Sequence, residues 1–280
     1  MKYKGRLLSE VSPLFYFIRV WQKRLFRCIQ WLVHFNKYRL GASDEKLPYR
    51  YARHSSKLMR DHLDDPRYAQ WQINKVKNLQ LALPHINNVL IPSGKRFSFC
   101  KLEGRPTRKK GYLEGMELSR GRAKPGIGGG LCQLSNLLNW LAWHTPLHVI
   151  ERSLHSFDPF PDSNRVLPFG SGAAIFWNYV DLQFHNPTNE TFQISVWIDG
   201  DSLRGEIRFS KPPIFEYQVF EKNHYFTKLN DQWFRSNEIW RNVYEKGKNG
   251  KPQKLIGEEF LVKNFSRVCY EPDVTRHECR

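Results

Sequence analysis

A cysteine, a histidine and an aspartate follow one another along this chain in positions from which they could act together. Cys132 ends a glycine-rich run, His155 comes 23 positions later, and Asp181 lies in a later apolar segment. A cysteine nucleophile needs a base to accept its proton, and that base needs a partner that orients it. The three residues are therefore candidates for nucleophile, base and orienting group, with His144 and His148 as rival bases.

Glycine occupies position 126 and positions 128–130, just before Cys132. Apolar residues then recur at helical spacing until Pro146, which predicts a buried helix over residues 132–143. The start of a helix presents unpaired N–H groups and a partial positive charge, so we expect the pKa of the Cys132 thiol to be lowered. Because glycine has no side chain, a substrate carbonyl could approach the backbone of this run closely. The N–H groups of Cys132 and Gly128–Gly130 would bind the developing oxyanion.

The glycine run also permits two other interpretations. It could bind a carboxylate or phosphate without breaking any bond, because a helix N-terminus attracts anions. It lacks, however, the Gly-Lys-Ser/Thr ending of a nucleotide-binding loop. Alternatively, Cys132 could be a buried structural residue. For either an enzyme or a binding module, the expected substrate-binding residues are Gly128, Gly129, Gly130, Gln133, Ser135 and Arg152.

The sequence gives no indication of a metal or a cofactor. Cys269, His277 and Cys279 lack a second pair of ligands at a fixed spacing, so we expect no metal there. We expect no bound cofactor either. The cysteines are five in number and widely scattered, which favours a reducing compartment and a cytoplasmic location.

Four segments after the predicted helix are typical of strands: residues 148–153, 173–186, 191–200 and 202–210. Asn186-Pro187 and Asp199-Gly200 are turn signals between them. We therefore predict an α+β domain in which an antiparallel sheet packs on the cysteine-bearing helix. The order of cysteine, histidine and aspartate is similar to that in papain-like and transglutaminase-like thiol enzymes, so a core of that kind is expected. Residues 211–280 predict a β-rich C-terminal extension with a hairpin around residues 248–250.

Composition limits the classes of partner. The chain has 280 residues, is 40% hydrophobic and carries a formal net charge of +17, so one core domain with appendages and an anionic partner are expected. It contains no helix-turn-helix, zinc-finger or RNP pattern, and nucleic acid is therefore not the expected partner. An anionic membrane surface is the alternative.

The N-terminal residues 1–40 form a basic amphipathic segment. Ser12-Pro13 is a helix start, and an apolar stripe follows at helical spacing: Leu14, Ile18, Trp21, Leu25, Cys28, Leu32 and Phe35. This stripe could dock on the protein's own core or on the inner face of an anionic membrane. Four cations exclude a membrane-spanning helix: Arg19, Lys23, Arg24 and Arg27. Residues 41–74 are polar and predict a helical linker broken at Asp65-Pro66.

Six motifs occur in order along residues 75–210: Ile91–Phe99 (IPSGKRFSF), Gly104 with Thr107, Gly111-Tyr112, Gly126–Leu138 (GIGGGLCQLSNLL), His144–Ser156 (HTPLHVIERSLHS) and Val180–Thr188 (VDLQFHNPT). Together they resemble the VanW family, known from B-type vancomycin resistance gene clusters. The chain departs from the family pattern at Cys100, where asparagine is usual, and at Gly172, where aspartate is frequent.

The resemblance implies a link to glycopeptide resistance or to cell-envelope peptidoglycan. The implied partner is a peptidoglycan precursor or a related peptide-like ligand. The resemblance supplies no activity, so both interpretations of the glycine loop remain. One is a thiol-dependent amidohydrolase or acyl transferase, and the other is a module that binds an anionic cell-wall precursor.

Overall fold

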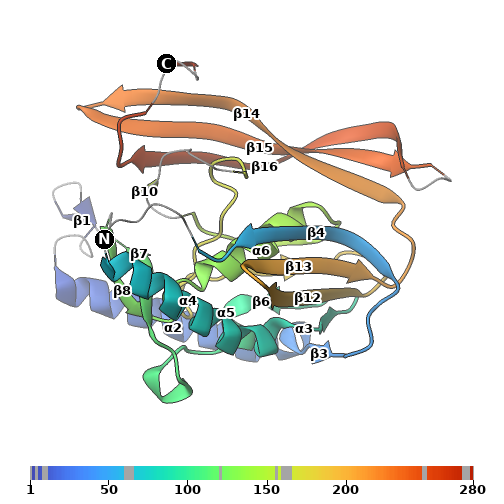
Figure 1. Ribbon diagram of the computed structural model, residues 1–280, viewed down its shortest axis with the longest axis horizontal. Coiled ribbons are helices and arrows are strands. Elements are labelled where there is room, and N and C mark those ends of the chain that lie inside the picture. The colour runs from blue at the N-terminus through green and yellow to red at the C-terminus, as the bar shows by residue number, and fades with distance from the viewer. Residues whose placement is uncertain are drawn as a thin grey trace.

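The computed structural model has a mixed α+β fold in which most strands pair antiparallel. It describes residues 2–3, 6–7, 12–59, 66–119, 122–154, 157–158, 166–247, 251–272 and 278–279. Two five-stranded sheets lie on either side of the helix α6 (Cys132–Trp143), as Figure 1 shows. This helix therefore occupies the middle of the molecule.

The first of these sheets carries the core. Its strands, in order across the sheet, are β3 (Gly41–Ala42), β5 (Val89–Ile91), β12 (Phe192–Asp199), β13 (Ser202–Phe209) and β4 (Tyr49–Lys57). All four neighbouring pairs are antiparallel. Helices α4 (Pro66–Ile86) and α6 contribute their apolar sides to the same hydrophobic core. Burial of such side chains is the main stabilising contribution to a fold of this size.

Smaller elements close the core around α6. A three-stranded sheet has the order β6 (Arg96–Ser98), β11 (Gln183–His185) and β9 (His148–Glu151). Phe97 of β6 and Phe184 of β11 stack with ring centroids 4.9 Å apart, and both are fully buried. The remaining short elements are α5 (Phe99–Glu103), the 3₁₀ turn η1 (Arg108–Lys110), the hairpin β7 (Glu114–Ser119) with β8 (Arg122–Ile127), and the N-terminal pair β1 (Lys2–Tyr3) with β2 (Arg6–Leu7).

The second five-stranded sheet is the C-terminal extension. Three long strands dominate it, β14 (Phe215–Leu229), β15 (Gln232–Lys246) and β16 (Pro252–Val268), with β10 (Phe157–Asp158) and β17 (Glu278–Cys279) at its edges. Arg241 of β15 donates to the carbonyls of Trp143 and Thr145 at 3.0 and 2.8 Å. These two bonds fix the sheet to the C-terminal end of α6.

Several predicted elements are confirmed. The helix over residues 132–143 has these bounds, the β12–β13 hairpin pairs from Phe192–Phe209 to Asp199–Ser202, and β9 lies within the predicted strand 148–153. The α+β class with a largely antiparallel sheet is confirmed too. Strands β15 and β16 pair on either side of residues 248–250, which themselves lie outside the described residues.

Two predicted elements are wrong in part. The helical linker predicted over residues 41–74 is wrong in its first part, because β4 occupies positions 49–57 and its pairing with β13 stabilises extended backbone there. Its second part is helical, since α4 begins at Pro66, at the predicted break. Residues 173–186 are not one strand, because the regular strand is limited to Gln183–His185. The preceding residues turn around the fully buried polar side chains of Asn178 and Asp181, which need hydrogen-bond partners from several directions.

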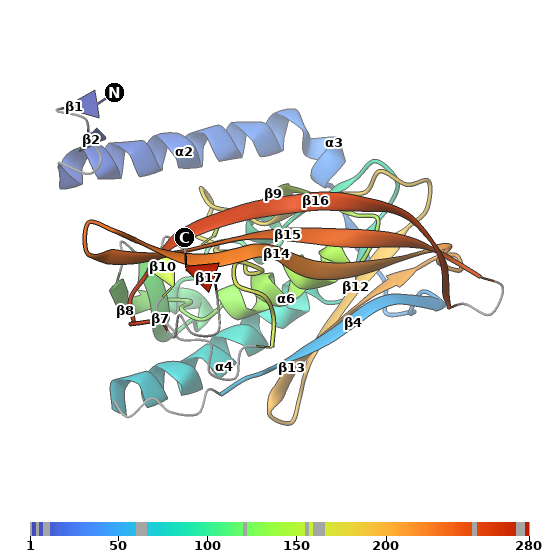
Figure 2. The ribbon, with the colours of Figure 1, turned by 90° about the horizontal axis from the view of Figure 1, so that it is seen from above.

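The N-terminal helix α2 (Pro13–Val33), followed by the short α3 (Phe35–Tyr38), runs along one edge of the molecule (Figure 2). Docking of its apolar stripe on the core is wrong, because no residue of α2 is buried. The reason is that a polar side of the helix makes the contacts with the core. Among the described residues, no helix combines the length and apolar character needed to cross a bilayer.

Candidate functional site

The glycine loop and Cys132 line a pocket of about 310 Å³ at the start of α6. Side chains from other parts of the chain complete its wall: Arg24 of α2, Cys100 and Glu103 of α5, Arg105 after α5, Glu117 of β7, and Trp177 with Tyr179 in the loop before β11. The pocket therefore combines a thiol, cations, carboxyl groups and aromatic rings. Ligand sites commonly have this mixture of an apolar wall and a few polar groups.

Packing against neighbouring segments accounts for the glycines of this loop. Gly128 and Gly130 have φ of +78° and +94°, in the left-handed region that favours glycine. A Cβ on Gly129 would lie 2.2 Å from the backbone carbonyl carbon of Gly115 in β7. The buried Asn78 of α4 donates to the Gly129 carbonyl at 2.9 Å and holds the loop in this position. Close contact between two backbones thus requires glycine, whether or not a substrate is bound.

The environment of the Cys132 thiol does not produce the lowered pKa that the sequence suggested. Burial raises the pKa of this thiol to about 11, although backbone hydrogen bonds from Ile175 and from Cys132 itself lower it. The prediction of a preformed thiolate is therefore wrong, because desolvation outweighs the favourable amides of the helix start. In the free protein the group is a neutral thiol at neutral pH.

The N–H groups of the loop are only partly free to bind an oxyanion. Gly128 N–H donates to the Leu113 carbonyl at 3.0 Å, and Gly129 N–H donates to the Gly126 carbonyl at 2.9 Å. For Gly130 and Cys132, no backbone carbonyl among the described residues accepts their N–H groups. The predicted oxyanion site is thus reduced to these two donors, of which the Cys132 N–H also bonds to the Cys132 sulfur.

His155 lies outside the described residues, as does Ser156. The residues just before His155 are held next to residues 173–175, because the Ser153 carbonyl accepts a hydrogen bond from Ala174 N–H at 2.7 Å. Ala174 precedes Ile175, whose backbone bonds to the Cys132 sulfur. The described part of this segment is therefore hydrogen-bonded to the residue next to Ile175, beside Cys132. The role of His155 as base stays a prediction.

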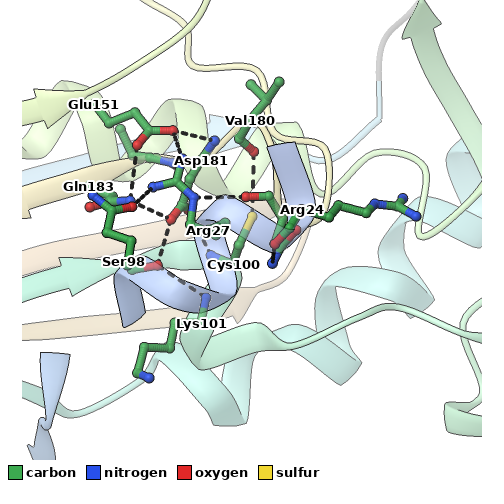
Figure 3. Close-up of polar contacts among 12 residues, drawn as sticks. Arg24, Arg27, Ser98, Cys100, Lys101, Glu151, Val180, Asp181 and Gln183 are labelled. Carbon is green, nitrogen blue, oxygen red and sulfur yellow. Dashed lines mark hydrogen bonds and ion pairs between the residues drawn. The ribbon is translucent and has the colours of Figure 1, made fainter. Parts of the chain in front are cut away.

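Asp181 belongs to a different cluster, which Figure 3 shows. Its carboxylate accepts hydrogen bonds from Ser98 Oγ at 2.6 Å and from Cys100 N–H at 2.8 Å. Gln183 Nε2 donates to Asp181 at 3.1 Å and to Glu151 at 3.0 Å, and Glu151 pairs with Arg27 of α2. Asp181 is fully buried and is not among the residues that line the pocket.

This cluster connects β6, β11, β9 and α2, so its role in the structure is to join them. Burial raises the pKa of Asp181, while its hydrogen bonds from Ser98 and Cys100 lower it. Because its acceptor positions are already used by these neighbours, the carboxylate has no evident path to an imidazole at Cys132. As an orienting group for the base, Asp181 remains only a prediction from chain order.

Three predicted substrate-binding side chains are committed to contacts elsewhere. Gln133 Nε2 donates to Ser56 Oγ and to the Lys57 carbonyl of β4, at 3.0 and 2.8 Å. Ser135 is buried and donates to the Ala173 carbonyl at 2.6 Å. Arg152 donates to the Gly172 carbonyl at 2.8 Å and also to the Gly170 carbonyl. None of the three lines the pocket, whereas Gly128, Gly129 and Gly130 do.

The two rival histidines lie away from the thiol. His144 caps the end of α6 opposite Cys132, and its Nδ1 lies 2.9 Å from the Trp140 carbonyl. A helix of 12 residues is about 18 Å long, so an imidazole at its far end does not reach the thiol. His148 is an exposed residue of β9. Burial lowers the pKa of both histidines.

Glu103 is the functional candidate that the sequence did not reveal. Its side chain is 3% exposed, lines the pocket, and accepts a hydrogen bond from the Tyr112 hydroxyl through Oε1. Its Oε2 has no hydrogen-bond partner among the described residues. Burial raises the pKa of this carboxyl to about 7, so it can hold or release a proton near neutral pH.

Cys100, where the family pattern has asparagine, is a second thiol of this pocket. Its backbone N–H binds Asp181, and its Sγ lies 3.5 Å from the Val180 carbonyl, within donating distance. Burial raises the pKa of this thiol. Within the described residues, no group of three His, Cys, Asp or Glu side chains could hold a metal ion.

Comparisons with known proteins place the chain in a family. The family described as VanW like protein matches residues 74–208. The chain is 32% identical, over 71% of its length and 71% of the other chain, to the vancomycin B-type resistance protein VanW of Enterococcus faecalis (strain ATCC 700802 / V583). It is 29% identical to the uncharacterized protein YoaR of Bacillus subtilis (strain 168), over 45% of its own length and 40% of that protein.

No solved structure is significantly similar to this fold, so a papain- or transglutaminase-like core stays a prediction. The extent of the sequence match carries the assignment instead. The family match over residues 74–208 includes the glycine loop, Cys132, Glu103 and the loop before β11 in the pocket wall, whereas Arg24 of α2 lies outside it. The chain belongs to the VanW family.

Proposed function

We propose that this protein is a thiol-dependent amidohydrolase or acyl transferase that acts on a peptide-like component of the cell envelope. One observation carries the proposal: Cys132 begins α6 in the wall of a pocket beside the N–H groups of Gly130 and Cys132, which no backbone carbonyl among the described residues accepts. A carbonyl placed there would meet a nucleophile and two oxyanion donors together. We choose peptidoglycan precursors as the substrate class because the relative is named as a vancomycin resistance protein.

The neutral thiol must lose its proton as the substrate is attacked. In the proposed reaction His155 takes this proton while Sγ of Cys132 bonds to the carbonyl carbon. The carbon–nitrogen bond then breaks, and the amine leaves with the proton that His155 returns. Water or a second amine next attacks the thioester and releases the thiol. Glu103 can assist, because a carboxyl with a pKa of about 7 in the same pocket can donate a proton to the leaving group.

A second function is favoured by the charge of the wall and by the neutral thiol. Arg24 and Arg105 both line the pocket, and both guanidinium groups lie within 5.7 Å of the centroid of the Trp177 ring. Cations held on an aromatic ring suit recognition of a carboxylate or phosphate. In this alternative the protein binds an anionic cell-wall precursor and breaks no bond.

Cys132→Ala and Cys132→Ser distinguish these functions. The protein would be incubated with a soluble peptidoglycan stem peptide, and intact-mass spectrometry would detect an acyl adduct while calorimetry measures binding. The enzyme proposal expects an adduct or turnover in the wild type that Cys132→Ala abolishes, with binding retained. Binding without any adduct or product, unchanged in both variants, would support the binding module. If the wild type neither binds nor converts the peptide, both proposals fail for this substrate class.

A further inference from the structure

Helix α2 is attached to the rest of the molecule through the side that carries Arg24, Arg27 and Trp31. Arg24 Nε donates to the Trp177 carbonyl at 3.2 Å, and Arg27 Nε donates to the Asn178 carbonyl at 3.0 Å. The Asn178 side chain donates back to the Arg24 carbonyl at 3.4 Å, and Arg27 also pairs with Glu151. These contacts fix the rotation of α2 about its own axis. The opposite side of the helix must therefore point away from the protein.

That opposite side, which we call the outer face of α2, is apolar. At about 100° per residue it covers roughly half of the helix circumference, and Gln22 is its polar member. Cys28 lies at its border, where its sulfur accepts a hydrogen bond from Asn178 Nδ2 at 3.4 Å. Its large apolar residues are each at least 44% exposed: Leu14, Phe15, Phe17, Ile18, Trp21, Leu25, Phe26, Ile29, Leu32 and Val33. Monomeric proteins rarely expose so large a contiguous apolar surface unless it binds a partner.

The charges around the outer face select the class of partner. Residues 11–43 contain six lysine or arginine residues and no aspartate or glutamate. Arg19 and Lys23 are exposed on the flank of the outer face. A second copy of this face would bring the same cations together, which is unfavourable, whereas an anionic surface would attract them. A helix that lies in a lipid interface typically has Leu, Ile, Phe and Trp on one face and cations at the flank of that face.

We propose that the outer face of α2 binds the surface of an anionic lipid bilayer, with the helix lying in the plane of the interface. The inner side of the same helix contributes Arg24 to the pocket wall, next to Trp177. The pocket therefore lies on the protein side of α2, about 10 Å (one helix diameter) from the lipid surface when α2 is bound. Figure 2 shows that α2 lies at the edge of the molecule, where a planar surface can reach it. This proposal stands independently of the chemistry at Cys132.

Sedimentation of the full chain with vesicles tests the proposal. Wild-type protein should bind vesicles of mixed phosphatidylglycerol and phosphatidylcholine at low salt, and binding should weaken in high salt and with phosphatidylcholine alone. Leu25→Glu combined with Ile29→Glu should weaken binding about tenfold or more, because both residues lie at the centre of the outer face. Lys23→Gln should weaken it about fivefold, since a cation near an anionic surface contributes about 1 kcal/mol.

The matched control is Ile73→Glu on α4, where an apolar side chain is 56% exposed away from the outer face, and wild-type binding is expected. All variants should keep the wild-type circular dichroism spectrum, because the substituted side chains are exposed. Wild-type protein that stays in the supernatant at low salt, or that binds both vesicle types equally, would overturn the proposal. So would a dimer in solution that the Leu25→Glu and Ile29→Glu pair abolishes, because the face would then belong to a second copy.

Discussion

Replacing Glu103 with glutamine should stabilise the protein at neutral pH but not at acid pH. Glu103 is 3% exposed, and its Oε2 lacks a hydrogen-bond partner among the described residues. Burial raises the pKa of this carboxyl from 4.5 to about 7. An ionised carboxylate is therefore disfavoured in the folded protein relative to the unfolded chain. Glutamine keeps the shape and an acceptor for Tyr112 but carries no titrating proton.

The sign and the size of the effect follow from proton linkage. Below pH 4.5 both the folded and the unfolded chain hold the proton on Glu103, so the raised pKa changes nothing. Between pH 4.5 and 7 Glu103 is ionised in the unfolded chain but not in the folded protein, which favours unfolding. Above pH 7 the resulting loss of folding stability has reached its full size. The rise in pKa from 4.5 to about 7 corresponds to about 3 kcal/mol. The stability of Glu103→Gln relative to wild type should therefore increase by about 3 kcal/mol from pH 4.5 to pH 8.

Urea unfolding of both proteins at several pH values between 4.5 and 8 measures this difference directly. Glu114→Gln is the control, because Glu114 is exposed and forms a surface ion pair with Arg108. That variant should differ from wild type by no more than about 1 kcal/mol across the same range. The assignment of Glu103 as a buried carboxyl with a raised pKa would be refuted by two results. One is a difference in unfolding free energy between Glu103→Gln and wild type that does not change with pH, and the other is a variant that becomes less stable than wild type as pH rises.

Three further outcomes are expected. Gly129→Ala should destabilise the protein by about 3 kcal/mol in urea unfolding, since its Cβ would overlap the Gly115 backbone; Gly41→Ala, with open space around it, should be nearly neutral. Cys132 should react with iodoacetamide at pH 8 about a hundredfold more slowly than a free thiol, because its pKa is about 11, and fast labelling in peptide mapping would contradict this. Arg27→Ala should cost about 3 kcal/mol by removing the cation that pairs with Glu151 and the hydrogen bond to the Asn178 carbonyl, and an unchanged midpoint in thermal unfolding would count against that contribution.

Local elements around the candidate nucleophile could be predicted because their signals are local. The apolar spacing after Cys132 and the position of Pro146 identify α6, and a turn signal at Asp199-Gly200 identifies the β12–β13 hairpin. β4 was missed because strand formation there depends on pairing with β13, a segment about 150 positions away. Propensity is a weak guide when such a distant partner stabilises the extended chain.

Only some of the residues that form the site could be predicted from the sequence. Chain order suggested Asp181 as the group that orients the base His155, yet in the structure its carboxylate joins β6, β11 and α2. Glu103 was not identified, because nothing in its immediate sequence distinguishes a buried carboxyl from a surface one. Its raised pKa arises from burial among segments that come together only in the folded chain.

The sequence by itself determined the family, the helix that begins at Cys132 and the apolar stripe of α2, since each depends on residue types at short spacing. Only the tertiary structure decided that the Cys132 thiol is neutral and that the apolar stripe of α2 faces outward. The physical reason is the same in both cases. Desolvation of a thiol and coverage of a helix face depend on which distant segments pack against them, and spacing along the chain does not specify those neighbours.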